Sequence, residues 1–228
     1  MIVIKKAQKH YKLGGELVKA LDGVNVEIDR GEFVAIVGPS GSGKTTLMHC
    51  IGGIDKLDDG EILVGGDDLS KMSDVELSRY RNKTVGFVFQ TFNLQPNLSA
   101  LENVELPLIF AGIGGKEAKI KAKGALEKVD LGSRLNHKPG QLSGGQRQRV
   151  CIARAIVNDP EIILADEPTG NLDSTNGRKI IDLLGDLSRK ENITLIIVTH
   201  DEKIAGKASR IINLLDGKVL KDEKSKNK

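Results

Sequence analysis

The stretch "GPSGSGKT" at residues 38–45 combines residue types that could bind phosphate. It fits G-x-x-x-x-G-K-[ST], follows the apolar run "FVAIV" and precedes a helix-like run, "TTLMHCIGG". In this pattern backbone N–H groups turn towards phosphates, the lysine reaches the β- and γ-phosphates, and the hydroxyl binds Mg²⁺. The pattern predicts a nucleotide site, against the alternative of a Gly/Ser turn. The expected ligands are Gly38, Ser40, Gly41, Ser42, Gly43, Lys44, Thr45 and Thr46, with Thr45 on the metal.

Two adjacent acids could complete such a site. Asp166 and Glu167 end the segment "IILADE", which reads as a buried strand. Ligands of α/β sheets bind at the carboxyl ends of strands. Asp166 would hold the metal through its water shell, and Glu167 would be the general base that polarises the attacking water. Surface charge or a helix cap is the alternative reading.

A second glycine-rich segment, "LSGGQ" at residues 142–146, also begins a helix. Helix N-termini bind phosphate, yet one nucleotide on the first loop would not need a second loop. We therefore expect this segment to contact a nucleotide held by another copy of the chain, in a head-to-tail homodimer that closes over ATP. Help supplied in trans is worth roughly 10³ to 10⁵ in rate in other phosphoryl-transfer enzymes. The expected contacts are Ser143, Gly144, Gly145 and Gln146.

The elements that must position these residues are short apolar strands and amphipathic helices. Strands are predicted at residues 2–7, 24–28, 33–37, 85–89, 161–165 and 194–198, and several lack polar alternation, as in a sheet covered on both faces. Between residues 91 and 160 the pattern is helical, with Ala118, Ala122 and Leu126 on one face of a helix. A second helix carries Val150 and Ala153 and ends before Pro160. The sequence predicts an α/β core with a helical insertion.

Composition narrows the function classes. The 228 residues are 39% hydrophobic and carry a formal charge of +3, too small to indicate nucleic acid as a partner. No apolar run approaches the roughly 20 residues that span a bilayer, and the N-terminus lacks a signal-peptide pattern, so we expect a cytoplasmic location. Cys50 and Cys151 have no metal-ligand spacing and read as buried thiols. The tail "LKDEKSKNK" reads as a solvated, frayed end.

In order along the chain, these motifs resemble the nucleotide-binding subunit of an ATP-binding cassette (ABC) transporter. The resemblance implies that Tyr11 stacks on adenine, that Gln90 links metal and water to the helical part, and that His200 senses the γ-phosphate. It also implies that "LSGGQ" is the family signature and that Asp173, in "NLD", lies at the dimer seam. Each residue also has a purely structural interpretation. Tyr11 could be a half-buried strand residue, Gln90 a loop amide without a role, and His200 a structural histidine. Asp173 could simply cap a helix. Asn171 stands where the family often has a small residue.

The resemblance implies a single nucleotide-binding domain over residues 1–228. Its fold is a P-loop NTPase core, a mixed sheet with flanking helices, with an N-terminal antiparallel β part. The core would comprise residues 1–90 and 160–228, and the helical signature subdomain residues 91–159. The catalytic set implied is Glu167, His200, Lys44 and Gln90, with the metal held by Thr45, Gln90 and Asp166.

The segment "QTFNLQPNLSALENVELPL" resembles small cassettes of the lipoprotein-release, macrolide-export and cell-division types. These work with a separate integral membrane permease, which would hold the chain on the cytoplasmic face of the membrane. A soluble ABC ATPase acting on DNA or ribosomes is the competing class, although the chain lacks a long coiled coil and a second cassette. A phosphate-transferring kinase or nucleotide sensor would have no use for "LSGGQ".

Overall fold

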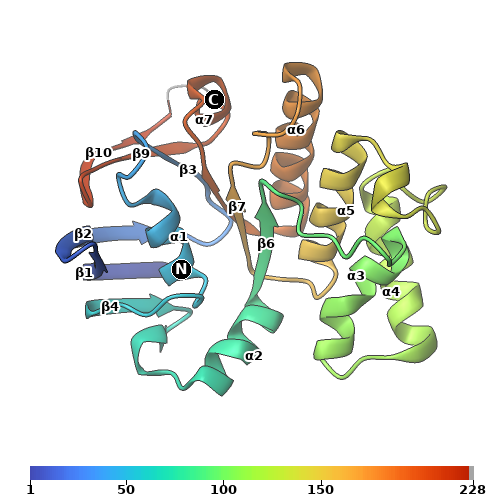
Figure 1. Cartoon of the computed structure of the whole chain (residues 1–228), viewed down its shortest axis with the longest axis horizontal. Helices are drawn as coiled ribbons and strands as arrows, with labels where there is room; N and C mark the ends of the chain where they lie inside the picture. Colours follow the sequence, from blue (N-terminus) through green and yellow to red (C-terminus); the bar gives the residue numbers. More distant parts are fainter. Residues whose placement is uncertain (226–228) are drawn as a thin grey trace. The chain divides into compact units, whose positions relative to one another are not determined.

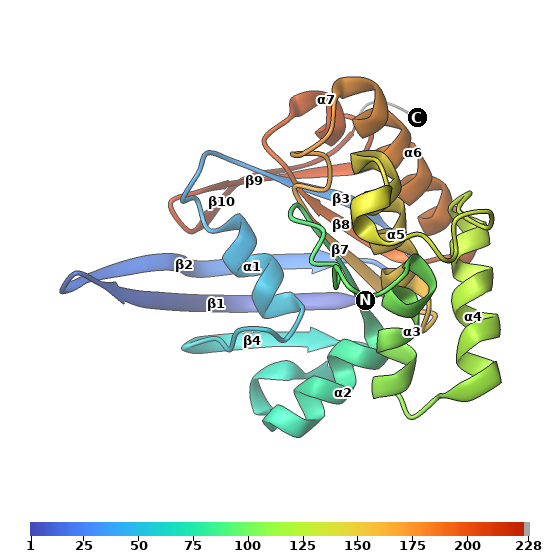
Figure 2. The same cartoon turned by 45° about the vertical axis from the view of Figure 1, so that its right-hand side comes forward.

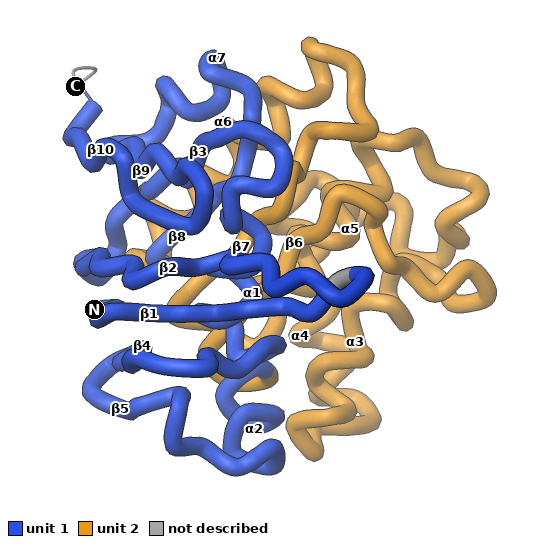
Figure 3. The backbone as a smooth tube through the Cα atoms, turned by 60° about the vertical axis from the view of Figure 1, so that its left-hand side comes forward, with its two compact units in different colours: residues 1–81, 194–228 blue, residues 82–193 orange. Residues whose placement is uncertain are grey.

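The computed structural model describes residues 1–225 and divides into two compact units, drawn in blue and orange in Figure 3. The first unit comprises residues 1–81 and 194–228, and the second comprises residues 82–193. The boundaries that we expected at residues 90 and 160 stay a prediction. Within the described part of the chain, no helix combines the length and apolarity that a membrane span requires.

An antiparallel sheet forms the N-terminal part of the first unit, where Figure 1 shows its main strands side by side. Its order is β2-β1-β4-β5. Alternating side chains of β2, from Val24 through Val26 to Ile28, are buried, as expected for a sheet with one covered face. The strands are β1 (Ile2–Leu13), β2 (Glu16–Ile28), β4 (Asp59–Val64) and β5 (Asp67–Asp68).

A mixed sheet forms the rest of the first unit. β3 pairs in parallel with β8 on one side and β9 on the other, and β10 pairs antiparallel with β9. Helix α1 contacts β8, and α7 contacts β3 through a small core at Ala35, Ala205 and Ala208. The elements are β3 (Phe33–Val37), α1 (Lys44–Ile51), β8 (Thr194–Val198), α7 (Glu202–Ala205), β9 (Arg210–Leu215) and β10 (Lys218–Lys224), with η1 at Leu69–Lys71.

The second unit consists of two parallel strands, four α-helices and the short 3-10 helix η2. Figure 2 shows α3, α4 and α5 close together, and each pair of the three is in contact. Helix α5 also contacts β6 and α6, so the helix that follows the second glycine-rich segment is central to this unit. The elements are β6 (Val85–Phe89), α3 (Ala100–Phe110), α4 (Gly115–Lys128), η2 (Pro139–Gln141), α5 (Gly144–Ile156), β7 (Ile162–Asp166) and α6 (Ser174–Glu191), preceded by α2 (Asp74–Thr84) at the boundary.

The predicted α/β class, with an antiparallel N-terminal part, a mixed sheet and a helical insertion, is confirmed. The predicted frayed tail was wrong up to residue 224, because β10 pairs with β9 and the Arg210 guanidinium binds the Asp222 carboxylate. Residues 226–228 lie outside the described residues. Both cysteines are buried, as predicted, and burial raises the pKa of each thiol to about 12.

Candidate nucleotide site

The phosphate loop, residues 38–45, connects β3 to α1, and the surrounding backbone fixes its shape. Gly43 has a φ of 98°, and a Cβ there would collide with the Ala20 carbonyl oxygen. Gly217, in the turn between β9 and β10, donates its N–H to the Ser42 carbonyl at 3.1 Å. Glycine is required at position 43 because its φ is positive and because the nearby Ala20 carbonyl oxygen leaves no room for a Cβ.

Two polar side chains of the phosphate loop, those of Ser42 and Lys44, are buried. Lys44 is 9% exposed, and its Nζ donates to the Pro39 carbonyl oxygen at 2.8 Å. Ser42 is 1% exposed, and its Oγ has no hydrogen-bond partner within residues 1–225. Buried hydroxyls normally have partners, so this unsatisfied Oγ and a folded-back lysine fit a loop that binds an anion.

His200 follows β8 at the same sheet edge as the phosphate loop. Ile36 of β3 is level with Val198 of β8 in the parallel register, so Gly38 and His200 come two residues later on neighbouring strands. The Thr199 N–H donates to the Ile36 carbonyl at 3.1 Å, which fixes the strand end. The His200 side chain is exposed. The first unit therefore brings the predicted histidine and the predicted phosphate loop to one edge.

Tyr11, on β1, is anchored by charged neighbours. Its hydroxyl donates to Asp55 Oδ2 at 2.5 Å, and Lys9 Nζ lies 5.4 Å from the ring centroid. Lys9 Nζ also forms a 2.8 Å ion pair with Asp55. Burial, followed by the hydrogen bond to Asp55, raises the pKa of Tyr11 to about 12, and the Thr46 side chain also bonds it. The hydroxyl therefore stays protonated, and Tyr11 lies beside the start of α1.

In the second unit, Gln90 and the acidic pair come together at one sheet edge. Phe89 of β6 is level with Asp166 of β7, so Gln90 and Glu167 are the next residues on two paired strands. Glu167 has a φ of 44°, a left-handed conformation uncommon for a non-glycine residue. Such outliers often occur at functional positions. Figure 1 shows β6 and β7 ending close together.

The signature loop, residues 142–146, caps α5 with its own side chains. The Ser143 Oγ accepts the Gln146 N–H at 3.3 Å, and the Gln146 Oε1 accepts the Ser143 N–H at 2.9 Å. This capping box satisfies two backbone donors of the helix start. A Cβ on Gly144 would lie 3.2 Å from Leu172, so this loop lies against residues 166–173, which we call the acidic loop.

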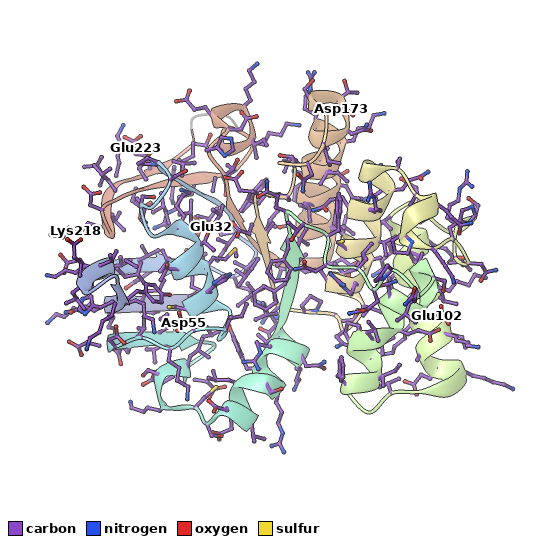
Figure 4. All side chains as sticks on the ribbon, in the orientation of Figure 1. Glu32, Asp55, Glu102, Asp173, Lys218 and Glu223 are labelled. Atoms are coloured by element: carbon purple, nitrogen blue, oxygen red, sulfur yellow. The ribbon has the colours of Figure 1, made fainter. Side chains whose placement is uncertain are left out.

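The acidic loop contacts Gln90 and begins α6. The Asn171 Nδ2 donates to the Gln90 carbonyl oxygen at 2.8 Å, and a Cβ on Gly170 would lie 2.5 Å from Gln90 Nε2. Asp173 caps α6 by accepting the Thr175 and Asn176 N–H groups at 3.0 and 2.9 Å. These hydrogen bonds, chiefly to Asn176, lower the pKa of Asp173. Figure 4 labels Asp173 at this helix start.

No sequence pattern identifies the side chains that hold Tyr11 and the glutamine-containing loop in place. Asp55 lies 44 residues from Tyr11, and Arg154 reaches carbonyl groups about 60 residues away. Neither belongs to a motif whose spacing we could read. No cluster of three or more His, Cys, Asp or Glu suited to a metal is found in residues 1–225. The predicted metal ligands, a hydroxyl, an amide and a single carboxylate, are compatible with that finding.

Residues 21–170 match the family model described as ABC transporter. The lipoprotein-releasing system ATP-binding protein LolD of Syntrophus aciditrophicus is 46% identical over 220 residues, 96% of this chain and 99% of LolD. The macrolide export ATP-binding/permease protein MacB of Hyphomonas neptunium is 48% identical over 226 residues, 99% of this chain but only 35% of MacB. A dimeric, post-hydrolysis structure of the ATP-binding cassette MJ0796 of Methanocaldococcus jannaschii, bound to ADP and Pi, is similar with a TM-score of 0.91, 48% identity and complete coverage of both chains.

Proposed function

The chain belongs to the ABC transporter family, and we propose that it is the ATP-hydrolysing subunit that drives a separate membrane permease. The predicted resemblance to lipoprotein-release and macrolide-export cassettes is confirmed by the likeness to LolD and MacB. The observation that carries the proposal is the phosphate loop between a strand and a helix start, in which the buried Ser42 hydroxyl has no hydrogen-bond partner among residues 1–225.

The first unit would bind and orient ATP. The N–H groups of the phosphate loop and the Lys44 ammonium would hold the β- and γ-phosphates, aided by the dipole of α1. Tyr11 would stack on the adenine, with its ring fixed by Asp55 and Lys9. His200 would donate a hydrogen bond to a γ-phosphate oxygen.

The second unit would supply the groups that activate water. Glu167 would accept the proton of the attacking water as general base, and the Gln90 side chain would orient that water. Thr45, Gln90 and Asp166 would hold Mg²⁺, which when bound neutralises charge on the β- and γ-phosphates. Gln90 and Glu167 follow paired positions of β6 and β7, which supports their acting on the same water.

The signature loop would act on the nucleotide of a second copy of the chain. Its N–H groups begin a 13-residue helix, and the capping box holds the loop in shape. Ser143, Gly144, Gly145 and Gln146 would contact the γ-phosphate held by the partner copy, and Asp173 would lie at the seam. The dimer of the similar cassette MJ0796, bound to ADP and Pi, supports this arrangement.

The pair of copies would dock on a permease near Gln90 and the helical insertion, on the cytoplasmic face of the membrane. The names of LolD and MacB, a lipoprotein-releasing and a macrolide-export protein, support an exporter or a mechanotransmission system. In that role, closure of the pair around ATP would pull on the permease, and hydrolysis would release it.

Glu167→Gln tests the hydrolytic mechanism and the dimer together. We expect kcat for ATP to fall about a hundredfold or more, because the general base is lost, while ATP affinity stays within twofold. Analytical ultracentrifugation with saturating MgATP should then detect a closed dimer, because bound ATP is no longer consumed.

Glu127→Gln is the matched control, since it removes the same charge from an exposed position on α4. It should hydrolyse ATP as the unaltered chain does and accumulate no stable dimer. A Glu167→Gln variant that stays monomeric with saturating ATP would contradict the cross-dimer role of the signature loop.

Co-purification tests the permease. Tagged Glu167→Gln with ATP would be captured from detergent-solubilised membranes of the source organism, and its companions identified by mass spectrometry. An integral membrane protein with a large external domain is the expected companion. Ribosomal proteins or DNA-repair factors with no membrane protein would favour a soluble ABC ATPase.

A further inference from the structure

The residues that follow Gln90 adopt an unusual backbone conformation. Phe92 and Asn93 have φ values of 59° and 50°, so two consecutive non-glycine residues are left-handed. That conformation is unfavourable for a residue with a Cβ, and for an aromatic residue more so than for asparagine. Such a turn persists only when surrounding groups hold it. We call residues 90–93 the glutamine loop.

The groups that hold the glutamine loop come from α5. Arg154 donates from Nη1 to the Asn93 carbonyl oxygen at 2.6 Å and from Nη2 to the Phe92 carbonyl oxygen at 2.8 Å. The Cys151 Sγ donates to the same Phe92 oxygen at 3.0 Å. The Arg147 guanidinium lies 5.0 Å from the Phe92 ring centroid. Three side chains at positions 147, 151 and 154 thus form one stripe on the helix.

Arg154 is suited to this task by its shape. Its guanidinium presents two donors in a fixed plane, and here each donor binds one of two successive carbonyl groups. A lysine offers a single point charge and could not fix both carbonyls in the same way. Burial lowers the pKa of Arg154 from its ordinary value, yet a guanidinium remains charged in proteins. The charge is therefore directed at the backbone of the glutamine loop.

The same helix begins at the signature loop. Ser143 and Gly144 form the N-terminus of α5, and Arg154 lies near its other end. Because a helix is stiff over this length, the glutamine loop and the signature loop are attached to one rigid element. The Asn171 amide adds a hydrogen bond to the Gln90 carbonyl from the acidic loop.

We propose that Arg154 is a positioning residue that sets the place of Gln90 relative to the signature loop. In this role Arg154 acts on hydrolysis only through Gln90, by holding the carbonyl groups of Phe92 and Asn93. This inference rests on the proposed function, in which Gln90 orients the metal and the attacking water. Removal of Arg154 should therefore lower the rate of hydrolysis without weakening the binding of ATP to the first unit.

A double-mutant cycle on the full chain tests this dependence. Arg154→Met keeps most of the side-chain stem. We expect this variant to lower kcat about tenfold and to leave KM for ATP within twofold of its original value. A tenfold effect is typical of the interaction energy between residues that are directly linked. The Mg²⁺ concentration needed for half-maximal rate should rise at the same time. In a Gln90→Ala background, Arg154→Met should lower the residual kcat by less than about twofold. An equal reduction in both backgrounds would overturn the proposal.

Two further variants separate positioning from folding. Arg154→Lys keeps the positive charge. In a chain that retains Gln90, its kcat should lie between those of Arg154→Met and the unaltered chain. In the Gln90→Ala chain, Arg154→Lys and Arg154→Met should have the same kcat. Arg154→Lys also serves if Arg154→Met does not fold. Arg189→Met removes an exposed arginine of α6 in the same unit and should leave kcat, KM and the Mg²⁺ requirement unchanged.

The outcomes also distinguish this inference from the proposed function. A chain that hydrolyses ATP but shows additive effects of positions 90 and 154 would refute the positioning role alone. A purified chain that neither binds nor hydrolyses ATP would refute the proposed function itself, whatever the variants do.

Discussion

The two units hold their candidate site residues by different means. In the first unit, the phosphate loop is shaped by backbone packed against backbone, as where Gly43 meets the Ala20 carbonyl. In the second unit, the glutamine loop is held mainly by side chains that lie far away in the sequence, such as those of Arg154 and Asn171. The first arrangement depends on glycine residues, and the second depends on polar side chains that donate hydrogen bonds to backbone carbonyl groups.

This difference indicates in which unit the loops can change their conformation. A loop fixed by close backbone approach has no alternative position without a collision. A loop fixed by hydrogen bonds from long side chains can shift as their rotamers change, at a cost of about 1 kcal/mol per lost bond. We therefore expect the phosphate loop to be preformed, and the glutamine loop to respond to nucleotide and partner.

The largest effect that would sharpen this comparison is expected at Gly43. Gly43→Ala would place a Cβ against the Ala20 carbonyl and keep a φ of 98°, so both overpacking and left-handed strain oppose folding. We expect the free energy of unfolding without nucleotide to fall by about 2–5 kcal/mol. Urea denaturation of the isolated chain would measure it.

Gly41 provides a matched control in the same loop. It too is left-handed, with a φ of 80°, but a Cβ there would meet nothing within 4 Å. Gly41→Ala should therefore cost only the conformational strain, about 1–2 kcal/mol. Equal losses for the two variants would mean that backbone packing does not fix the phosphate loop, and the comparison between the units would fail.

These glycines explain why much of the first unit could be predicted. The phosphate loop has a recognisable spacing because Gly41 and Gly43 meet a local requirement for positive φ, and the strand before the loop is an apolar run. The same holds for the signature loop, where Ser143 and Gln146 form a capping box within four residues. Short-range requirements of this kind leave a pattern that the sequence retains.

The supporting contacts could not be predicted, because they join residues far apart in the chain. The partnership of Arg154 with Phe92 depends on how α5 packs against β6, and nothing in the spacing of "LSGGQRQR" indicates it. The strand β10 was missed for a similar reason. Its residues are mostly charged, and they pair only because β9 offers an edge and Arg210 binds Asp222.

A smaller effect is expected at Tyr11, whose side-chain anchor is an exception within the first unit. Tyr11→Phe removes the hydroxyl that binds Asp55, so the ring would be less firmly placed for adenine. We expect KM for ATP to rise about three- to tenfold, the worth of roughly one hydrogen bond, while kcat changes less than twofold. Steady-state ATPase assays would measure both.

Tyr80 is the natural control, because it is the other tyrosine of the chain. Its buried hydroxyl donates to the Ile51 carbonyl at 2.8 Å, also in the first unit. Tyr80→Phe should lower the stability by about 1 kcal/mol and leave KM unchanged. If both variants raised KM equally, the Tyr11 effect would reflect general loosening of the unit and not placement of the ring.

The smallest effect concerns two carboxylates, the half-buried one of Asp22 in the first unit and the exposed one of Asp173 in the second. The pKa of Asp173 is lowered chiefly by the Asn176 N–H, and that of Asp22 chiefly by the Lys218 ammonium, 3.2 Å away; Figure 4 labels Asp173 and Lys218. Both folded pKa values lie below the unfolded value of 3.8. Each carboxylate therefore stabilises the folded chain above that pH, and its contribution is lost as pH falls through the folded pKa.

The pKa values of the two carboxylates should respond differently to salt. At 1 M NaCl the screening length is about 3 Å, so the ion pair of Asp22 with the exposed Lys218 weakens, whereas the short hydrogen bonds of Asp173 to fixed N–H groups persist. In carboxyl-carbon NMR titrations we expect the pKa of Asp22 to move up towards 3.8 with salt, and that of Asp173 to change much less. If salt raised both pKa values equally, the Asp173 carboxylate would stabilise the start of α6 through its charge and not through directed hydrogen bonds. The acidic loop would then be held less firmly than those hydrogen bonds imply.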